Sequence, residues 1–367
     1  MTKKILSLDE VSQRINEGIG KFKLLSPETG YYIDSQRGKN FFWLEENKIR
    51  MNMAFEGTHQ PTSFGYFKSK KGYNSKYKNN KQFANHYGEY ISSIILKQLG
   101  KKACKVDLGV VNVTNPYSGK TLEVEGILSH YQLDRTEMMI PANVIIERFK
   151  GSNPKKYKEL IGGGNSASEN HYTNIEILLT AFEDTFRKSS MPEKVPEIRK
   201  YIFDMCAFDI KFGNRDRHDE NLGLKFNQQT NKFDMYHLFD NEQILGMQEN
   251  KSDIIGYLGD PKKFEKFKEK ELTSCIGIPG APQKIDPMEL LKYLLQKYPE
   301  EMRSSLADIG RYTHSDLIEV MNSCEGLSEE HKAFASKIFL DREKSIQKLL
   351  EELDKSKFSK DDDELDL

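Results

Sequence analysis

The chain has 367 residues, of which 37% are hydrophobic and 30% are charged. Its 55 lysines and arginines nearly balance its 56 aspartates and glutamates, so the net charge gives no reason to expect a protein that binds nucleic acid or membranes. The length is sufficient for a large core and for two lobes, and the charged fraction predicts a soluble surface.

The cysteines and the N-terminus both favour a cytoplasmic protein. The four cysteines are widely spread and have no CxxC spacing, which argues against a zinc site or a disulfide framework and suits a reducing compartment. The N-terminal residues contain no apolar stretch of the kind that a signal peptide needs, and no apolar run approaches the length of a membrane span.

Residues 1–131 have the pattern of an antiparallel sheet with helices, and we expect them to form an N-terminal lobe. Ser7 to Glu10 form a capping box before a short helix. Asn85 to Leu99 carry apolar residues at helical spacing, and Gly100 is the stop signal. Short β-favouring runs predict strands at residues 22–25, 30–33, 41–44, 49–55, 64–67, 106–113 and 122–129.

A basic stretch separates the fifth predicted strand from the helix. Lys68 to Lys81 contain six lysines, two tyrosines and no acidic residue. Such a mixture could bind a nucleic-acid backbone and stack bases. A charge run of this kind is more often a solvated loop, and that is what we predict here.

Beyond Tyr131 the patterns are mostly helical, so we expect residues 132–353 to form a C-terminal lobe. Residues 152–168 predict a mobile loop, because the glycine triplet at 162–164 does not follow a strand as a phosphate-cradling loop would. The acidic residues 354–367 have few apolar positions and predict a disordered tail. Helical spacing predicts helices at residues 174–186, 198–212, 287–297, 315–321 and 328–353.

The most informative stretch is Asn214 to Gly223, which reads NRDRHDENLG and follows the helix that ends before Gly213. Asp216 is followed five residues later by Asn221, and Asp240 lies nineteen residues further on, after a predicted hairpin. In this order a kinase-type site supplies a base and two metal ligands. Asp216 would accept or orient the proton of a substrate hydroxyl, while Asn221 and Asp240 would hold magnesium.

Other interpretations of this stretch are a simple turn, a zinc site and a calcium loop. It could be an Asn/Asp-rich turn whose side chains only cap backbone groups. His218 is most simply a brace within the loop, because zinc binding by His218 and His237 lacks the further ligands that complete a site. A calcium loop of the usual kind would need a glycine at its sixth position, which is absent.

The residues Asn214 to His218 with Asn221 and Gly223, followed by Leu238 to Asn241, resemble the catalytic and metal-binding segments of the HipA-like serine/threonine kinases. The similarity extends more weakly over roughly residues 64–246, and only the catalytic segment is specific. The resemblance implies an α+β fold with two lobes, a β-rich N-terminal lobe and a mainly helical C-terminal lobe, with ATP bound between them.

The resemblance also implies a nucleotide site in the N-terminal lobe. Lys68 would contact the ATP phosphates, with Lys70 and Lys71 as alternatives, and Glu89 on the following helix would hold that lysine as an ion pair. The hinge along the adenine would lie at residues 127–131, with Leu128, Ser129 and His130 as the binding residues.

The chain departs from the kinase pattern in three places. Residues 57–63 occupy the position of a glycine-rich loop but contain one glycine, and Thr58, Thr62 or Ser63 could instead be autophosphorylated. Asn241 and Glu242 replace the Phe-Gly of protein kinases, which leaves the magnesium-binding carboxylate intact. No activation segment ending in Ala-Pro-Glu is evident.

These observations predict a kinase that uses ATP and Mg²⁺ to phosphorylate serine or threonine of a protein, including itself. The resemblance further implies an antitoxin-like or regulatory partner. Two alternatives stay open: a small-molecule or lipid kinase of the same fold, and a non-catalytic module that binds nucleic acid or a partner. Direct nucleic-acid binding and membrane binding are not expected.

Overall fold

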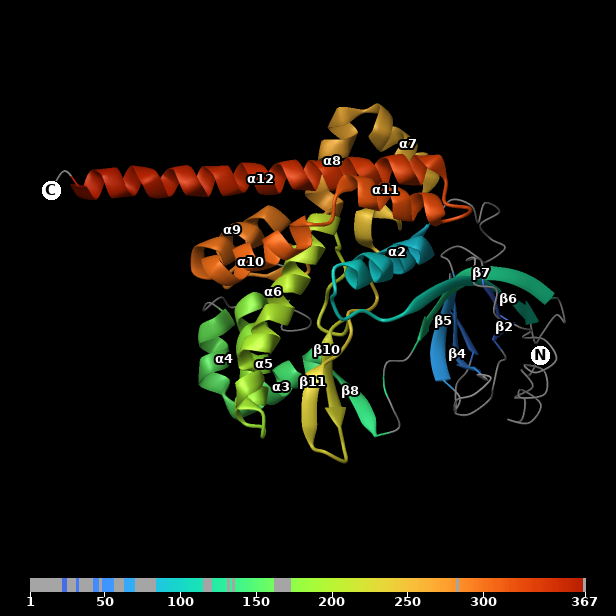
Figure 1. Ribbon diagram of the computed structural model, residues 1–367, viewed down its shortest axis with the longest axis horizontal. Helices are drawn as coiled ribbons and strands as arrows, with labels where there is room; N and C mark the ends of the chain where they lie inside the picture. Colours follow the sequence, from blue (N-terminus) through green and yellow to red (C-terminus); the bar gives the residue numbers. More distant parts are fainter. Residues whose placement is uncertain are drawn as a thin grey trace, which may run out of the picture.

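The computed structural model describes residues 22–24, 31–32, 42–45, 48–55, 63–69, 84–114, 121–130, 133, 136–161, 173–281 and 284–365. A twisted sheet lies at one end of the molecule and most of the helices lie at the other (Figure 1). The predicted α+β class is therefore confirmed. The capping box at residues 7–10 falls outside the described residues.

The N-terminal sheet has seven strands in the order β2-β1-β6-β7-β5-β4-β3, and every neighbouring pair is antiparallel. Each strand coincides with one of the predicted runs, which shows that short runs of aromatic and aliphatic residues located them correctly. The strands are β1 (Phe22–Leu24), β2 (Tyr31–Tyr32), β3 (Phe42–Glu45), β4 (Lys48–Phe55), β5 (Ser63–Ser69), β6 (Val106–Thr114) and β7 (Thr121–His130).

Helix α2 (Asn85–Gln98) connects this sheet to the rest of the molecule. Its buried face includes Tyr87, Ile91 and Ile95, which belong to the apolar stripe predicted from the sequence. That face packs against β6 and β7, and the helix also contacts elements of the C-terminal region (Figure 1). The helix ends where predicted, and Gly100 follows with a φ of 68°.

The C-terminal region is built around α6 (Val195–Phe212), which packs against several other helices. Large aromatic side chains fill the space around it, and those that are fully buried are Phe182, Phe186, Phe203, Phe208, Phe212, Phe334 and Phe339. The surrounding helices are α3 (Ala142–Ser152), α4 (Pro154–Ile161), α5 (Ile175–Arg187), α7 (Lys251–Gly259), α8 (Pro261–Glu271), α9 (Pro287–Lys297), α10 (Pro299–Gly310), α11 (His314–Ser323) and α12 (Glu329–Leu365), with short 3-10 helices η2 (Pro192–Lys194) and η3 (Ile244–Gly246).

Two small sheets complete this region. The first has the order β11-β10-β8 and contains β8 (Glu137–Pro141), β10 (Gly223–Asn227) and β11 (Lys232–Met235). The second pairs β9 (Thr173–Asn174) with β12 (Ile276–Gly277). The β10–β11 hairpin was predicted, whereas β8 was not. The hairpin matters most for the site, because it connects Asn221 to Asp240 along the chain.

The structure differs from the sequence predictions in two segments. The predicted loop at 152–168 is wrong for residues 154–161, which form α4, because Tyr157, Leu160 and Ile161 share one side of the helix and pack against the core. The glycine triplet lies outside the described residues. Helix α12 continues to Leu365, into the stretch predicted to be disordered, and this stretch contains no glycine or proline that would end a helix.

The structure was also searched for membrane-spanning helices and for disulfide bonds. None of the described helices is long and apolar enough to cross a membrane. All four cysteines are free thiols in the structure, in line with their spacing in the sequence.

Candidate active site

The loop that carries Asp216 begins at the C-terminal end of α6. Gly213 ends the helix with a φ of 63°, a left-handed conformation that glycine adopts without strain. Asn214 then folds back on the helix, because its backbone N–H donates to the Asp209 carbonyl (2.9 Å) and its side chain donates to the Asp209 carboxylate (2.8 Å). Asn221 closes the loop by donating its side-chain amide to the Asp216 carbonyl at 2.8 Å.

Arg217 holds this loop to the segment that carries Asp240. Its guanidinium is almost fully buried and donates to both carboxylate oxygens of Asp209, at 2.9 and 3.1 Å. It also donates to the carbonyls of Asn221 (2.8 Å) and Phe239 (3.1 Å), and to the Asn241 side chain. Burial disfavours the charged form of Arg217, but the Asp209 carboxylate outweighs this effect and raises its pKa.

Lys68 on β5 meets three carboxylates that come from distant parts of the chain. Its ammonium is bonded to Asp240 and lies 3.5 Å from Glu89 on α2 and 3.7 Å from Glu242. Glu89 also accepts the backbone N–H of Asp240 at 3.0 Å. The sheet, α2 and the segment after the hairpin therefore converge on one buried ammonium.

The charges of this cluster are unbalanced, because three carboxylates surround one ammonium. Burial alone would lower the pKa of Lys68, but Asp240, Glu89 and Glu242 raise it well above its usual value, so the lysine is charged. For Glu89, burial raises the pKa to about 7, with Lys68 opposing and the other two carboxylates reinforcing the increase. The excess negative charge of the cluster would therefore favour binding of a further cation beside Asp240.

A close packing contact joins α2 to the segment that follows Asp240. A Cβ atom at Gly88 would lie 2.5 Å from the Glu242 carbonyl oxygen, so only glycine allows this approach. Asn85 donates its side-chain amide to the Glu242 carboxylate at 3.2 Å, and Ala84 donates its backbone N–H to the Met247 carbonyl at 3.1 Å. These contacts fix the helix that carries Glu89 relative to Asp240.

Comparison with known proteins identifies the architecture. No protein-family model matches the sequence, and no curated protein matches it. The crystal structure of the Helicobacter pylori proinflammatory kinase CtkA superposes with a TM-score of 0.59 at 16% identity, over 85% of this chain and 97% of that chain. The chain therefore has the overall fold of this kinase. The Shewanella oneidensis toxin–antitoxin complex of HipA, HipB and operator DNA matches with a TM-score of 0.47 at 14% identity, over 93% of this chain and 72% of that chain.

Within this kinase fold, the predicted hinge residues lie on β7. Leu128 and Ser129 are each paired with a residue on both neighbouring strands, and His130 donates its backbone N–H to the Lys105 carbonyl at 2.8 Å. The main-chain groups of these residues are therefore already used within the sheet. Residues 131–132 and 134–135 lie outside the described part of the chain.

The protein offers some, but not all, of the oxygen atoms that a magnesium ion would need. In the described part of the chain, no three His, Cys, Asp or Glu side chains form a group that could hold a metal ion. Asn221 and Asp240 both carry side-chain oxygens, and Asn221 uses only its amide nitrogen for Asp216. Mg²⁺ typically binds one or two protein carboxylates and completes its shell with phosphate oxygens and water, which fits this pair and the excess negative charge beside it.

Sequence reasoning missed two residues of this candidate site. Arg217 could have been found, because an arginine inside an Asn/Asp-rich loop, eight residues after Asp209, is a plausible ion-pair partner. Glu242 carried no such signal, since it contacts Lys68, a residue far away in the sequence. His218 acts within its own loop as predicted, because its Nδ1 accepts the backbone N–H of Glu220 at 3.2 Å.

Proposed function

We propose that the protein is an ATP- and Mg²⁺-dependent kinase that transfers the γ-phosphate to a serine or threonine of a protein. The observation that carries this proposal is the convergence of Lys68, Glu89 and Asp240, which are 21 to 172 residues apart in the sequence. Phosphoryl transfer depends mainly on positioning and charge neutralisation, and a buried lysine between two acidic residues supplies both.

Asp216 is the proposed base. It lies half-buried at the turn of the loop, with its backbone held on one side by Asn214 and on the other by Asn221. In the proposed reaction the acceptor hydroxyl gives its proton to the Asp216 carboxylate, and its oxygen forms a bond to the γ-phosphorus. The bond from the γ-phosphorus to the β–γ bridging oxygen breaks, and ADP leaves with that electron pair.

Lys68 and the two metal ligands are proposed to hold the phosphates. Lys68 would donate to phosphate oxygens, and Glu89 would keep its ammonium in place after ATP has displaced part of the contact with Asp240. Asn221 and Asp240 would bind Mg²⁺, which when present neutralises charge on the phosphates. Arg217 would keep the proposed base and both metal ligands in one rigid arrangement through its bonds on either side of the hairpin.

The test is transfer of radiolabelled γ-phosphate to the protein itself and to a generic acceptor such as casein. Asp216→Ala and Asp240→Ala should each lower the rate by about 100-fold or more, because each removes a group that acts in the transition state. Glu193→Ala serves as the control, since Glu193 is exposed on η2, outside the loop, strand and helix that carry the proposed site residues.

Folding must be checked alongside, by comparing far-UV circular dichroism and thermal midpoints of all variants. Labelling that is equal in wild type, Asp216→Ala and Asp240→Ala would refute the proposal. Binding of ATP with Mg²⁺, measured as a thermal shift that is lost in Asp240→Ala, separates a failure of catalysis from a failure of nucleotide binding.

The acceptor is also part of the proposal. Self-labelling is expected at Thr58, Thr62 or Ser63; Ser63 is the first residue of β5, and the two threonines lie outside the described residues. Phosphopeptide mapping after incubation with ATP would identify the modified residue, and an unmodified 57–63 peptide from labelled protein would exclude this position. A regulatory partner of the antitoxin kind stays a prediction.

A further inference from the structure

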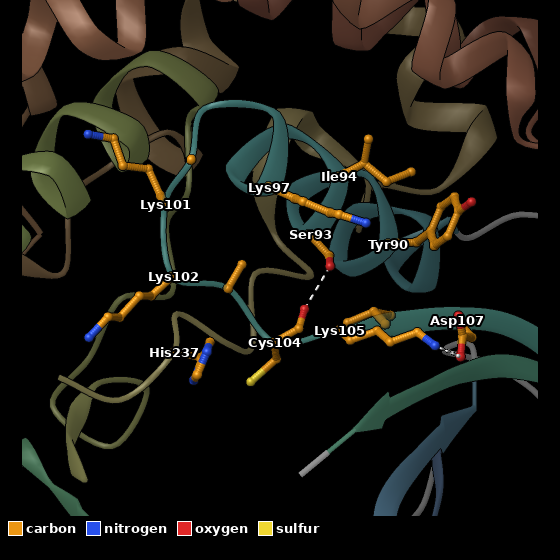
Figure 2. Close-up of a pocket in the computed structure, with 13 residues that line it drawn as sticks. Tyr90, Ser93, Ile94, Lys97, Lys101, Lys102, Cys104, Lys105, Asp107 and His237 are labelled. Atoms are coloured by element: carbon orange, nitrogen blue, oxygen red, sulfur yellow. Dashed lines mark hydrogen bonds and ion pairs between the residues drawn. The ribbon is translucent and has the colours of Figure 1, made fainter. Parts of the chain in front are cut away.

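A cavity of about 640 Å³ lies between the second half of α2, the loop at residues 99–105, the start of β6 and His237 (Figure 2). Lys68, Asp216 and Asp240 do not line it, so it is distinct from the proposed phosphotransfer site. Pockets that hold small organic ligands typically have volumes of about 300 to 1,000 Å³. The cavity is therefore large enough for a ligand of that kind.

The charged lining of this cavity is mostly basic, with four lysines and one aspartate: Lys97, Lys101, Lys102, Lys105 and Asp107. Two of the lysines are already neutralised by carboxylates outside the cavity. Lys101 is bonded to Asp204 (2.7 Å) and Asp308 (3.1 Å), and Lys102 is bonded to Asp234 (2.8 Å). In Figure 2 these two side chains point away from the helix and toward the C-terminal region.

The other two lysines keep much of their charge for a ligand. Lys97 is exposed in the last turn of α2, and no described carboxylate forms an ion pair with it. Lys105 is also exposed, and its ammonium lies 3.7 Å from the Asp107 carboxylate. That carboxylate is bonded more closely to His130 Nε2, at 2.6 Å, so it neutralises Lys105 only in part.

The remaining walls offer apolar surface and one unsatisfied polar atom. Tyr90 and Ile94 lie one turn apart on α2, and the buried Val106 lies on β6. The Nδ1 atom of His237 is buried and has no hydrogen-bond partner among the described residues. Burial, with Lys102 and Lys225 nearby, lowers the pKa of His237, so its ring is neutral at neutral pH and can make one more hydrogen bond.

We propose that this cavity binds a small organic phosphate. The phosphate would lie on Lys97 and Lys105, the carbon skeleton would contact Tyr90 and Ile94, and a hydroxyl or amide of the ligand would pair with His237. Lysine binds phosphate as a point charge without demanding one geometry, which suits two exposed, flexible side chains.

A ligand held in this way would also restrain the loop at residues 99–105. Ser93 donates its hydroxyl to the Cys104 carbonyl at 2.7 Å (Figure 2), so α2 and the loop are already joined at one point. Leu238 exchanges two backbone hydrogen bonds with the loop, from Cys104 N–H (3.1 Å) and to the Lys102 carbonyl (3.0 Å). A phosphate that contacts both Lys97 and Lys105 would add a second link between α2 and the loop.

Isothermal titration calorimetry with phenyl phosphate as the probe tests this site. We expect the wild-type protein to bind phenyl phosphate more tightly than inorganic phosphate, because only the former has a ring to contact Tyr90 and Ile94. The Lys97→Ala, Lys105→Ala double variant should weaken binding by about tenfold or more, since it removes two charge-assisted contacts. Backbone amides at Cys104 and Leu238 should exchange hydrogen more slowly when the probe is bound.

The matched control is Lys262→Ala, Lys266→Ala, which makes the same charge change at exposed positions of α8 and should alter affinity by less than about twofold. A Lys97→Arg, Lys105→Arg variant should still bind phenyl phosphate. Its binding would show that the alanine variant loses affinity because of the lost charge and not because of a folding defect. Equal weakening by both alanine pairs, or no binding of phenyl phosphate at about 10 mM, would overturn the proposal.

Two further outcomes also count against it. Inorganic phosphate that binds as tightly as phenyl phosphate would point to an adventitious anion rather than an organic ligand. A phosphoserine peptide that binds about tenfold more tightly than phenyl phosphate through the same lysines would assign the cavity to a protein partner instead. The titration contains no nucleotide, so it gives a result whether or not the protein is a kinase.

Discussion

Replacement of Arg217 by methionine should destabilise the protein strongly, although Arg217 touches no substrate in the proposed mechanism. The change leaves the buried Asp209 carboxylate without its cation, which typically costs about 3 to 5 kcal/mol. The carbonyls of Asn221 and Phe239 each lose a donor, at about 1 kcal/mol apiece. Asn214 still donates to Asp209, which favours the lower end, so we expect a total of about 5 to 6 kcal/mol.

Such a loss is a large part of the stability of a typical protein, about 5 to 15 kcal/mol. Urea unfolding followed by circular dichroism measures it. The control is Arg199→Met, because Arg199 also forms ion pairs, with Glu183 and Glu301, but is partly exposed. Its loss should cost about 1 kcal/mol or less. If Arg217→Met costs no more than Arg199→Met, then the buried arginine does not hold the site together as we infer.

Adding Asp209→Asn to Arg217→Met provides a second check on the same reasoning. The amide removes the uncompensated charge, so the double variant should recover part of the stability lost in the single variant. Additive losses would mean that the two side chains do not interact energetically, in spite of their two hydrogen bonds.

Three further predictions follow from the carboxylate cluster and the helix beside it. Because the pKa of Glu89 is raised by burial from 4.5 to about 7, its contribution to stability is present below the unfolded pKa and is lost as the pH rises through the folded one. Urea unfolding at about pH 5 and about pH 7.5 should show a smaller loss for Glu89→Gln than for wild type; equal losses would contradict the shift. Glu242→Gln should move the titration of Glu89 to lower pH, as followed by carbon NMR of labelled glutamate, since the Glu242 carboxylate raises the Glu89 pKa; an unchanged titration would exclude this coupling. Gly88→Ala should abolish phosphotransfer and destabilise the fold, whereas Gly151→Ala on α3, where a Cβ meets nothing within 4 Å, should be neutral or slightly stabilising; tolerance of alanine at both positions would show that α2 does not need its close approach.

The sequence predicts best what is encoded locally. The run of apolar residues on α6, Gly213 at its end and the polar loop that follows all lie within thirty residues, and the structure has each of them in place. The seven strands of the N-terminal sheet were also located correctly, because glycine, asparagine and charged pairs separate them. Strand order could not be read in the same way, since the adjacency of β1 and β6 depends on packing rather than on local pattern.

The contacts of Lys68 show where local reasoning ends. Its pairing with Glu89 was expected from the resemblance, and the ion pair is present at 3.5 Å. The bond to Asp240 and the proximity of Glu242 depend on how α2 packs on a segment more than 150 residues away. Helix α4 was missed for a related reason: half of its residues are charged, and the contact of Tyr157, Leu160 and Ile161 with the core depends on the tertiary structure.

The close contact between Gly88 and Glu242 restricts which conformational changes could inactivate the proposed kinase. The helix that carries Glu89 and the segment that carries Asp240 are joined by a van der Waals contact, two side-chain hydrogen bonds and a main-chain bond from Ala84. An outward swing of α2 alone would break all of these together, so helix and segment should move as one rigid body. Regulation of the proposed kinase would therefore act more easily through access of the acceptor, or through strand β5 that carries Lys68, than through the orientation of α2.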